Sequence, residues 1–154
     1  MKIRVIAPGK IREKWLTEGI NEYIKRLSKY CSVEITEVAD SPDTLPVDVA
    51  LQKEGELILS KIRKEDVVWV MDLHGDLLTS EKISEALIED MRKGGSSVTV
   101  VIGGSNGLWE PVVKRADRRI CLGRITLTHQ MTRLILLEQI YRGYKIANGE
   151  KYHK

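Results

Sequence analysis

Two glycine-rich turns follow apolar segments in the C-terminal half of the chain. The segment 98–102 leads into the turn 103–107 (GGSNG), and the segment 119–122 leads into Gly123. Glycine permits tight turns and lets a ligand approach the main chain closely. Two such turns after neighbouring strands predict a site that encloses a flat small molecule. Tight turns without any ligand are the alternative that the glycines alone leave open.

Several common kinds of site do not fit these turns. A dinucleotide fold would carry GxGxxG after the first strand, where residues 7–10 are APGK, and the turn 103–107 lacks that spacing. Such a fold would also carry an acid about twenty residues after its glycine turn, but residues 121–124, past the turn 103–107, are CLGR. The chain has no GK[ST] sequence, which argues against a P-loop. The three histidines, His74, His129 and His153, lie in separate segments without metal-ligand spacing, so no metal is expected.

The last predicted helix and the tail carry side chains able to move a proton or bind an anion. Glu138 and Arg142 are four residues apart and share one side of a helix, where they either serve a site or form an ordinary surface ion pair. Tyr152 and His153 lie beside the end of the chain, a place where disorder is common. An imidazole, with a reference pKa of about 6.5, suits general acid–base chemistry.

Five strands and five helices are predicted to position these groups. Apolar residues recur at helical spacing at Leu16, Ile20 and Leu27, and the nearly continuous apolar run 66–73 is typical of a strand covered on both faces. The predicted strands are 2–7, 33–38, 66–73, 97–102 and 119–122, with a turn at 74–76. The predicted helices are 12–30, 47–63, 80–93 with Thr79 as its cap, 110–116 and 129–146. In the second helix the expected apolar face consists of Val49, Leu51, Leu57, Ile58 and Ile62.

This alternation predicts an α/β fold with a parallel-rich sheet and helices on both faces. Ligands of such sheets bind outside the carboxyl ends of the strands, where the glycines of this chain gather. The length of 154 residues predicts a single domain, and the net charge of +3 permits an RNA partner without requiring one. No apolar run approaches the ~20 residues of a membrane span, and Cys31 and Cys121 are expected to be reduced thiols, so a cytoplasmic protein with no membrane partner is predicted.

Five motifs together resemble one known family. They are MKIRVIAPGK at the start, DLHG in mid-chain, IGGSNG, LTHQMTRLILLEQIYRGYKI, and YHK at the end. The chain is similar from end to end to the ribosomal RNA large subunit methyltransferase H (RlmH) family of the SPOUT class. The resemblance implies a C-terminal trefoil knot, an exception to the usual avoidance of knots, and a homodimer. It also implies S-adenosylmethionine-dependent methylation of N3 of a pseudouridine in helix 69 of 23S rRNA, with assembled 70S ribosomes as the expected substrate.

The resemblance assigns residues to two groups. The expected cofactor contacts are Met71, Gly103, Leu122, Gly123, Arg124, Ile125, Thr126 and Leu127. The expected catalytic residues are His153, Glu138, Arg142 and Tyr152, and the base is either His153 or Glu138. Candidate phosphate contacts are Arg133, Lys145, Lys151 and Lys154, whereas His129 either orients the cofactor turn or packs in the core.

A non-catalytic module that binds ribosomes or senses a nucleotide through the same pocket is the alternative function. The tail separates the two hypotheses, because a sensor needs no Tyr-His pair beside a methyl group.

Overall fold

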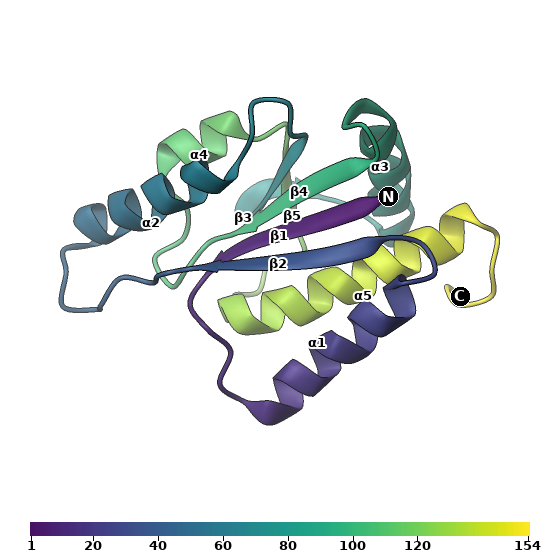
Figure 1. Cartoon of the computed structure of the whole chain (residues 1–154), viewed down its shortest axis with the longest axis horizontal. Coiled ribbons are helices and arrows are strands. Elements are labelled where there is room, and N and C mark those ends of the chain that lie inside the picture. The colour runs from purple at the N-terminus through teal and green to yellow at the C-terminus, as the bar shows by residue number, and fades with distance from the viewer.

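All five strands belong to one parallel sheet in the computed structural model, which describes residues 1–154. The strands are β1 (Lys2–Pro8), β2 (Ser32–Val38), β3 (Val68–Leu77), β4 (Ser97–Ile102) and β5 (Arg118–Cys121). Their order across the sheet is β2-β1-β4-β3-β5, and every neighbouring pair is parallel (Figure 1). The predicted α/β fold is therefore confirmed.

Helices cover both faces of this sheet (Figure 1). The helices are α1 (Lys14–Leu27), α2 (Val47–Lys61), α3 (Ser80–Lys93), α4 (Glu110–Arg115) and α5 (His129–Ala147). Helices α1, α3 and α5 pack in the larger core cluster on one face, and α2 and α4 pack in a smaller cluster on the other. In β4, Val100 joins the larger cluster and Val101 the smaller one, which explains why the central strands are continuously apolar.

Strand β3 departs from the prediction that residues 74–76 form a turn. It continues to Leu77, and both Met71 and Asp76 pair with Ile120 of β5, so that residues 72–75 bulge out of the ladder. Gly75 makes this possible, because a Cβ there would lie 2.6 Å from the backbone carbon of Arg119. The prediction of a turn was wrong, since the glycine marks a close approach of two strands.

The buried face of α2 also differs from the prediction. Ala50, Glu54, Gly55 and Ile58 are buried, whereas Val49 and Leu57 are exposed. The reason is tertiary: the Trp109 side chain packs so closely on Gly55 that a Cβ there would lie 2.5 Å from the ring. The positions of the aliphatic residues in the sequence could not indicate that Glu54 and Gly55 are among the buried residues of α2.

Helix α5 begins after its cap residue Thr128, whose hydroxyl accepts a hydrogen bond from the Met131 backbone N–H at 3.1 Å. The preceding element, β5, is an edge strand, yet α5 packs between α1 and α3 on one face of the sheet (Figure 1). The connection 122–128 therefore has to cross from the edge of the sheet to that face. The trefoil knot stays a prediction of the resemblance. No helix of the structure is long and apolar enough to cross a membrane.

Candidate functional site

The expected cofactor contacts lie near the carboxyl ends of β4 and β5, with Met71 of β3 between those two strands. Met71 pairs with Ile102 of β4 on one side and with Ile120 of β5 on the other. Gly103 follows β4 directly, and Leu122 follows β5 directly. The sheet order thus brings together three segments that are far apart in the sequence.

The segment 122–127, called the cofactor loop below, leaves its main chain available to a ligand. None of its N–H or C=O groups takes part in a backbone–backbone hydrogen bond. The only side-chain bond to its main chain is donated by the Cys121 thiol to the Gly123 carbonyl, at 3.0 Å. A Cβ on Gly123 would meet no atom within 4 Å, and Ile125 is 71% exposed. Free amide and carbonyl groups next to apolar side chains suit the edge and face of an adenine ring, so the loop fits S-adenosylmethionine.

The first glycine turn has a different character, because it is closed on itself. The Gly107 N–H donates to the Gly104 carbonyl at 3.0 Å, and Gly107 has a positive φ of 89°. A Cβ on Gly103 would lie 2.5 Å from the Gly107 carbonyl oxygen, and one on Gly104 would lie 2.8 Å from Glu54 Oε2. Close packing within the protein therefore accounts for glycine at position 103, and open space for a ligand is found at Gly123.

The bulge of β3 supports the cofactor loop from one side. Arg119 donates twice to Asp72 Oδ2, at 2.9 and 2.6 Å, and Arg124 donates to the Leu73 carbonyl at 3.2 Å. Burial works against the charged form of Asp72, but hydrogen bonds from the His74 N–H and Arg119 outweigh it and lower the pKa of the carboxyl. The His74 contribution is its backbone N–H, while the residue itself is exposed.

Arg133, an expected phosphate contact, is 1% exposed, and that expectation was wrong. Its guanidinium donates to the Pro8 and Gly9 carbonyls, both at 2.8 Å, and to Glu37 at 3.0 Å. It holds the start of the β1–α1 connection against α5. His129 lies beside it, where burial and then the Arg133 charge lower the pKa of the imidazole.

The C-terminal tail folds back onto α5 and the start of α3, where the four expected catalytic residues meet (the tail cluster). The Glu138 carboxylate accepts hydrogen bonds from Arg142, at 2.5 and 3.1 Å, and from the Tyr152 hydroxyl at 3.2 Å. The Arg142 guanidinium also lies over the Tyr152 ring, 4.7 Å from its centroid. Sequence reasoning had no means to find Glu81, whose carboxylate lies 2.7 Å from His153 Nε2.

The neighbours of His153 determine where its proton lies. Arg142 has only donors, and its Nη1 is 3.3 Å from His153 Nδ1, so this ring nitrogen must accept. The other nitrogen, Nε2, then carries hydrogen and donates to Glu81. In this arrangement the Nδ1 atom faces Arg142 and the Nε2 atom faces Glu81.

Tyrosine packing explains why the tail is ordered. The ring of Tyr141 in α5 lies 4.9 Å from that of Tyr152 in an edge-on contact and 6.1 Å from that of Tyr23 in α1. Burial, followed by hydrogen bonding with Tyr23 and the charge of Glu138, raises the pKa of Tyr152 well above its ordinary value. The Tyr152 hydroxyl therefore stays protonated and acts as a donor.

Of the other expected phosphate contacts, Lys145 forms an ion pair within the protein. Its ammonium group lies 2.5 Å from Glu150, which also accepts from the Tyr30 hydroxyl at 2.8 Å. Lys151 and Lys154 are exposed and form no ion pair. These two remain available for RNA.

Within one chain, no hydrogen bond or ion pair joins the tail cluster to the cofactor loop. The Tyr152 and His153 side chains form hydrogen bonds with residues of α1, α3 and α5, and none with residues 122–127. The expected cofactor residues and the expected catalytic residues therefore form two separate groups within one chain.

Comparison with known proteins places the whole chain among methyltransferases. A family model described as "Predicted SPOUT methyltransferase" matches residues 1–153. Ribosomal RNA large subunit methyltransferase H 1 of Clostridium perfringens is 48% identical, and ribosomal RNA large subunit methyltransferase H of Enterococcus faecalis is 46% identical, each over the full length of both chains. A solved structure titled as a probable methylase family protein from Haemophilus influenzae matches with a TM-score of 0.54 at 13% identity, over 99% of this chain and 70% of that one. The low identity makes this last match a statement about the fold alone.

Proposed function

This chain belongs to the SPOUT methyltransferase family, and we propose that it uses S-adenosylmethionine to methylate N3 of a pseudouridine in helix 69 of 23S rRNA. Its full-length relatives are named for methylation of large-subunit ribosomal RNA. The one observation that carries the proposal is the cofactor loop after β5, beside the bulge of β3, whose main-chain groups are free for a ligand. The expected substrate is the assembled 70S ribosome, in the cytoplasm.

The proposed cofactor half consists of Met71, Gly103 and the loop 122–127. Met71 and the exposed Ile125 offer apolar walls, and the amides of the loop offer donors and acceptors to the adenine edge. Bound S-adenosylmethionine supplies a methyl group already activated by a sulfonium. The task left to the protein is to align the acceptor and to remove its proton.

N3 of a pseudouridine carries a weakly acidic hydrogen, so a base must accept it as the methyl group arrives. The contacts favour His153 over Glu138 in this role. Glu138 already accepts hydrogen bonds from Arg142, Tyr152 and Gln139, which leaves little capacity for another proton. His153 holds an available lone pair on Nδ1 that faces only Arg142. Release of this contact would expose a neutral imidazole, and Glu81 would stabilise the imidazolium that forms.

A homodimer is the proposed working form, in which the tail cluster of one chain meets the cofactor loop of the other. Two observations support it. The two halves of the site share no polar contact within one chain. Apolar side chains also lie unprotected around the cofactor loop, where Leu73, Leu77 and Ile125 are exposed. The proposed unit is otherwise a single SPOUT domain spanning residues 1–154.

Calorimetry with S-adenosylmethionine, followed by methyl transfer to 70S ribosomes that lack the modification, tests the proposal. Binding with transfer to N3 is the expected result. Binding without transfer would favour the non-catalytic module, and no binding would refute the assignment of the cofactor loop. A tail-deleted chain (1–150) is the matched control: it should bind the cofactor but transfer nothing.

A further inference from the structure

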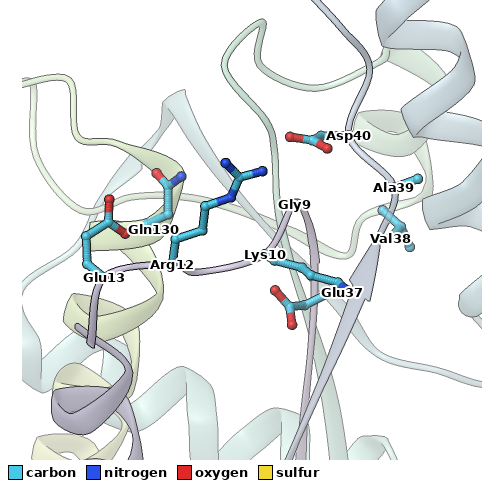
Figure 2. Close-up of a pocket in the computed structure, with 9 residues that line it drawn as sticks. All are labelled: Gly9, Lys10, Arg12, Glu13, Glu37, Val38, Ala39, Asp40 and Gln130. Atoms are coloured by element: carbon cyan, nitrogen blue, oxygen red, sulfur yellow. The ribbon is translucent and has the colours of Figure 1, made fainter. Parts of the chain in front are cut away.

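A hollow lies beyond the carboxyl ends of β1 and β2, on the same side of the strand ends as the cofactor loop. Its volume is about 680 Å³, a size suited to a nucleotide. It is lined by Gly9, Lys10, Arg12, Glu13, Glu37, Val38, Ala39, Asp40 and Gln130 (Figure 2). No residue of the cofactor loop or of the tail cluster lines it. The hollow is therefore separate from both halves of the proposed active site.

The hollow is nevertheless close to the cofactor loop along the chain. Gln130, in the first turn of α5, lines it, and the loop ends three residues earlier at Leu127. Three residues span at most about 10 Å. A strand of RNA with its target base beside the loop therefore has its flanking nucleotides within reach of the hollow.

The two basic side chains of the hollow have no partners of their own. Lys10 and Arg12 form no ion pair and no side-chain hydrogen bond, although most basic side chains of the tail region do. In Figure 2 the Arg12 guanidinium lies between Gln130 and Asp40, and Lys10 extends toward Glu37. Unpaired cations on a mildly basic protein suit phosphate oxygens.

The carboxylates that line the hollow limit the class of ligand that it can bind. A bare anion would be repelled by the carboxylates of Glu13, Glu37 and Asp40. A nucleotide in RNA fits better, because it offers phosphate to the cations and base N–H or ribose hydroxyl groups to the acceptors.

The floor of the hollow is rigid before any ligand arrives. The buried Arg133 fixes the Pro8 and Gly9 carbonyls and Glu37. Gly9 has a positive φ of 81°, and a Cβ there would lie 3.2 Å from Asp40 Oδ2. A site held in place in this way spends little binding energy on ordering its own backbone.

An exposed aromatic ring follows the hollow along the chain. Trp15, in the first turn of α1, is 60% exposed, whereas Trp69 is 1% exposed. It is also the only aromatic residue among the exposed large hydrophobic residues. An exposed indole that is close in the sequence to Arg12 and Lys14 is suited to stack on an unpaired base.

We propose that this hollow, with Lys10, Arg12 and Trp15, binds a nucleotide that flanks the methylated one and so positions the RNA strand. The inference rests on the proposed function, since it assigns the RNA a path from the cofactor loop across the start of α5 to the β1–α1 connection. Lys10 and Arg12 contact the phosphate, and Trp15 stacks on a base.

The first test compares two double variants of the full-length protein that each remove two positive charges. K10A/R12A alters the hollow, and K53A/K64A alters exposed lysines on and after α2, on the other face of the sheet. Ribosome affinity by co-sedimentation and KM for ribosomes should weaken at least about tenfold in K10A/R12A, and the slope of log affinity against log salt should fall by about 2. The kcat at saturating ribosomes and the affinity for S-adenosylmethionine should stay within about twofold. The control variant should match the wild type in every measurement.

The second test uses Trp15. W15A should raise the KM for ribosomes about 5- to 150-fold, the loss expected for one stacked base, and W15F should recover most of it. Dimer formation, followed by analytical ultracentrifugation, should be unchanged in both variants.

Three results would overturn the proposal: ribosome affinity of K10A/R12A equal to that of the control, loss of cofactor affinity in that variant, or dissociation of the W15A dimer. The last result would make Trp15 a subunit contact. Failure of the proposed function itself would look different. A wild-type protein that transfers no methyl group, while K10A/R12A still weakens ribosome binding selectively, would leave the hollow as an RNA site and refute the methylation.

Discussion

Replacing Arg133 by methionine should destabilise the protein without any RNA present. Methionine keeps an unbranched side chain of similar length but has no donor, so the Pro8 and Gly9 carbonyls and the Glu37 carboxylate each lose a hydrogen bond. The side chain at this position is 1% exposed, so water cannot easily replace the donors to the two carbonyls.

The magnitude follows from the burial of each partner. Each carbonyl left unsatisfied costs about 1–2 kcal/mol. The Glu37 side chain is 37% exposed and regains water, so its loss adds at most about 1 kcal/mol. Burying methionine in place of a guanidinium whose Nε has no partner returns part of this cost. The net loss should be about 2–4 kcal/mol, which in a chain of this size lowers Tm by roughly 5–15 °C.

Urea unfolding at one fixed protein concentration is the assay, because a dimer makes apparent stability depend on concentration. R133K is the matched control: it keeps the charge but not the planar fork, and should lose about half as much. An R133M variant within about 0.5 kcal/mol of the wild type, combined with weaker ribosome binding, would refute the structural role and restore Arg133 as an RNA contact.

Three further predictions concern the proposed site. H153A should lower kcat at least about 100-fold, the usual contribution of a general base, and should change cofactor affinity less than about threefold. Single-turnover transfer measures the first effect and calorimetry the second. A loss of cofactor affinity with kcat unchanged would exclude proton transfer by His153. Because the pKa of His129 is lowered in the folded state, its contribution to stability is fully present above the unfolded-state value of about pH 6.5 and is lost as the pH falls from there through the lower folded-state pKa. Urea titrations of H129Q should therefore show a flatter dependence on pH between about 5 and 7 than those of the wild type, and an unchanged slope would contradict this expectation. In urea unfolding, G103A should lose about 2 kcal/mol or more of its free energy of unfolding, because the added Cβ would lie 2.5 Å from the Gly107 carbonyl oxygen. G123A should fold normally and lose cofactor affinity, because a Cβ there meets no atom within 4 Å. Equal stability of the two variants would refute the distinction between the glycine turns.

The boundaries of most elements were predictable because local patterns determine them. Thr79 and Thr128 cap the helices that follow them, and both hydroxyls accept a backbone N–H of the first turn. Val68, Trp69 and Val70 of β3 are buried, Trp69 on one face of the sheet and the two valines on the other, as the continuous apolar run predicted. Such signals involve residues within a few positions of one another, so the sequence displays them directly.

The errors in the prediction arose where a distant segment determines a conformation. Residues 74–76 have the composition of a turn, but they form part of β3 because Gly75 fits against the backbone of Arg119. Arg133 is of a residue type that is usually exposed on a helix, but here it is buried, and its guanidinium donates to two carbonyls of the β1–α1 connection.

The sequence by itself determined the α/β class and the family, and it predicted residues for each half of the proposed site, since these depend on local periodicity and on motifs. Only the tertiary structure decided how those residues are used. It left the main chain of the cofactor loop unpaired, placed Glu81 against His153, and kept the tail cluster out of contact with that loop. Each of these facts depends on pairs of groups tens of residues apart, and their approach is determined by the packing of the whole fold rather than by any pattern within one segment.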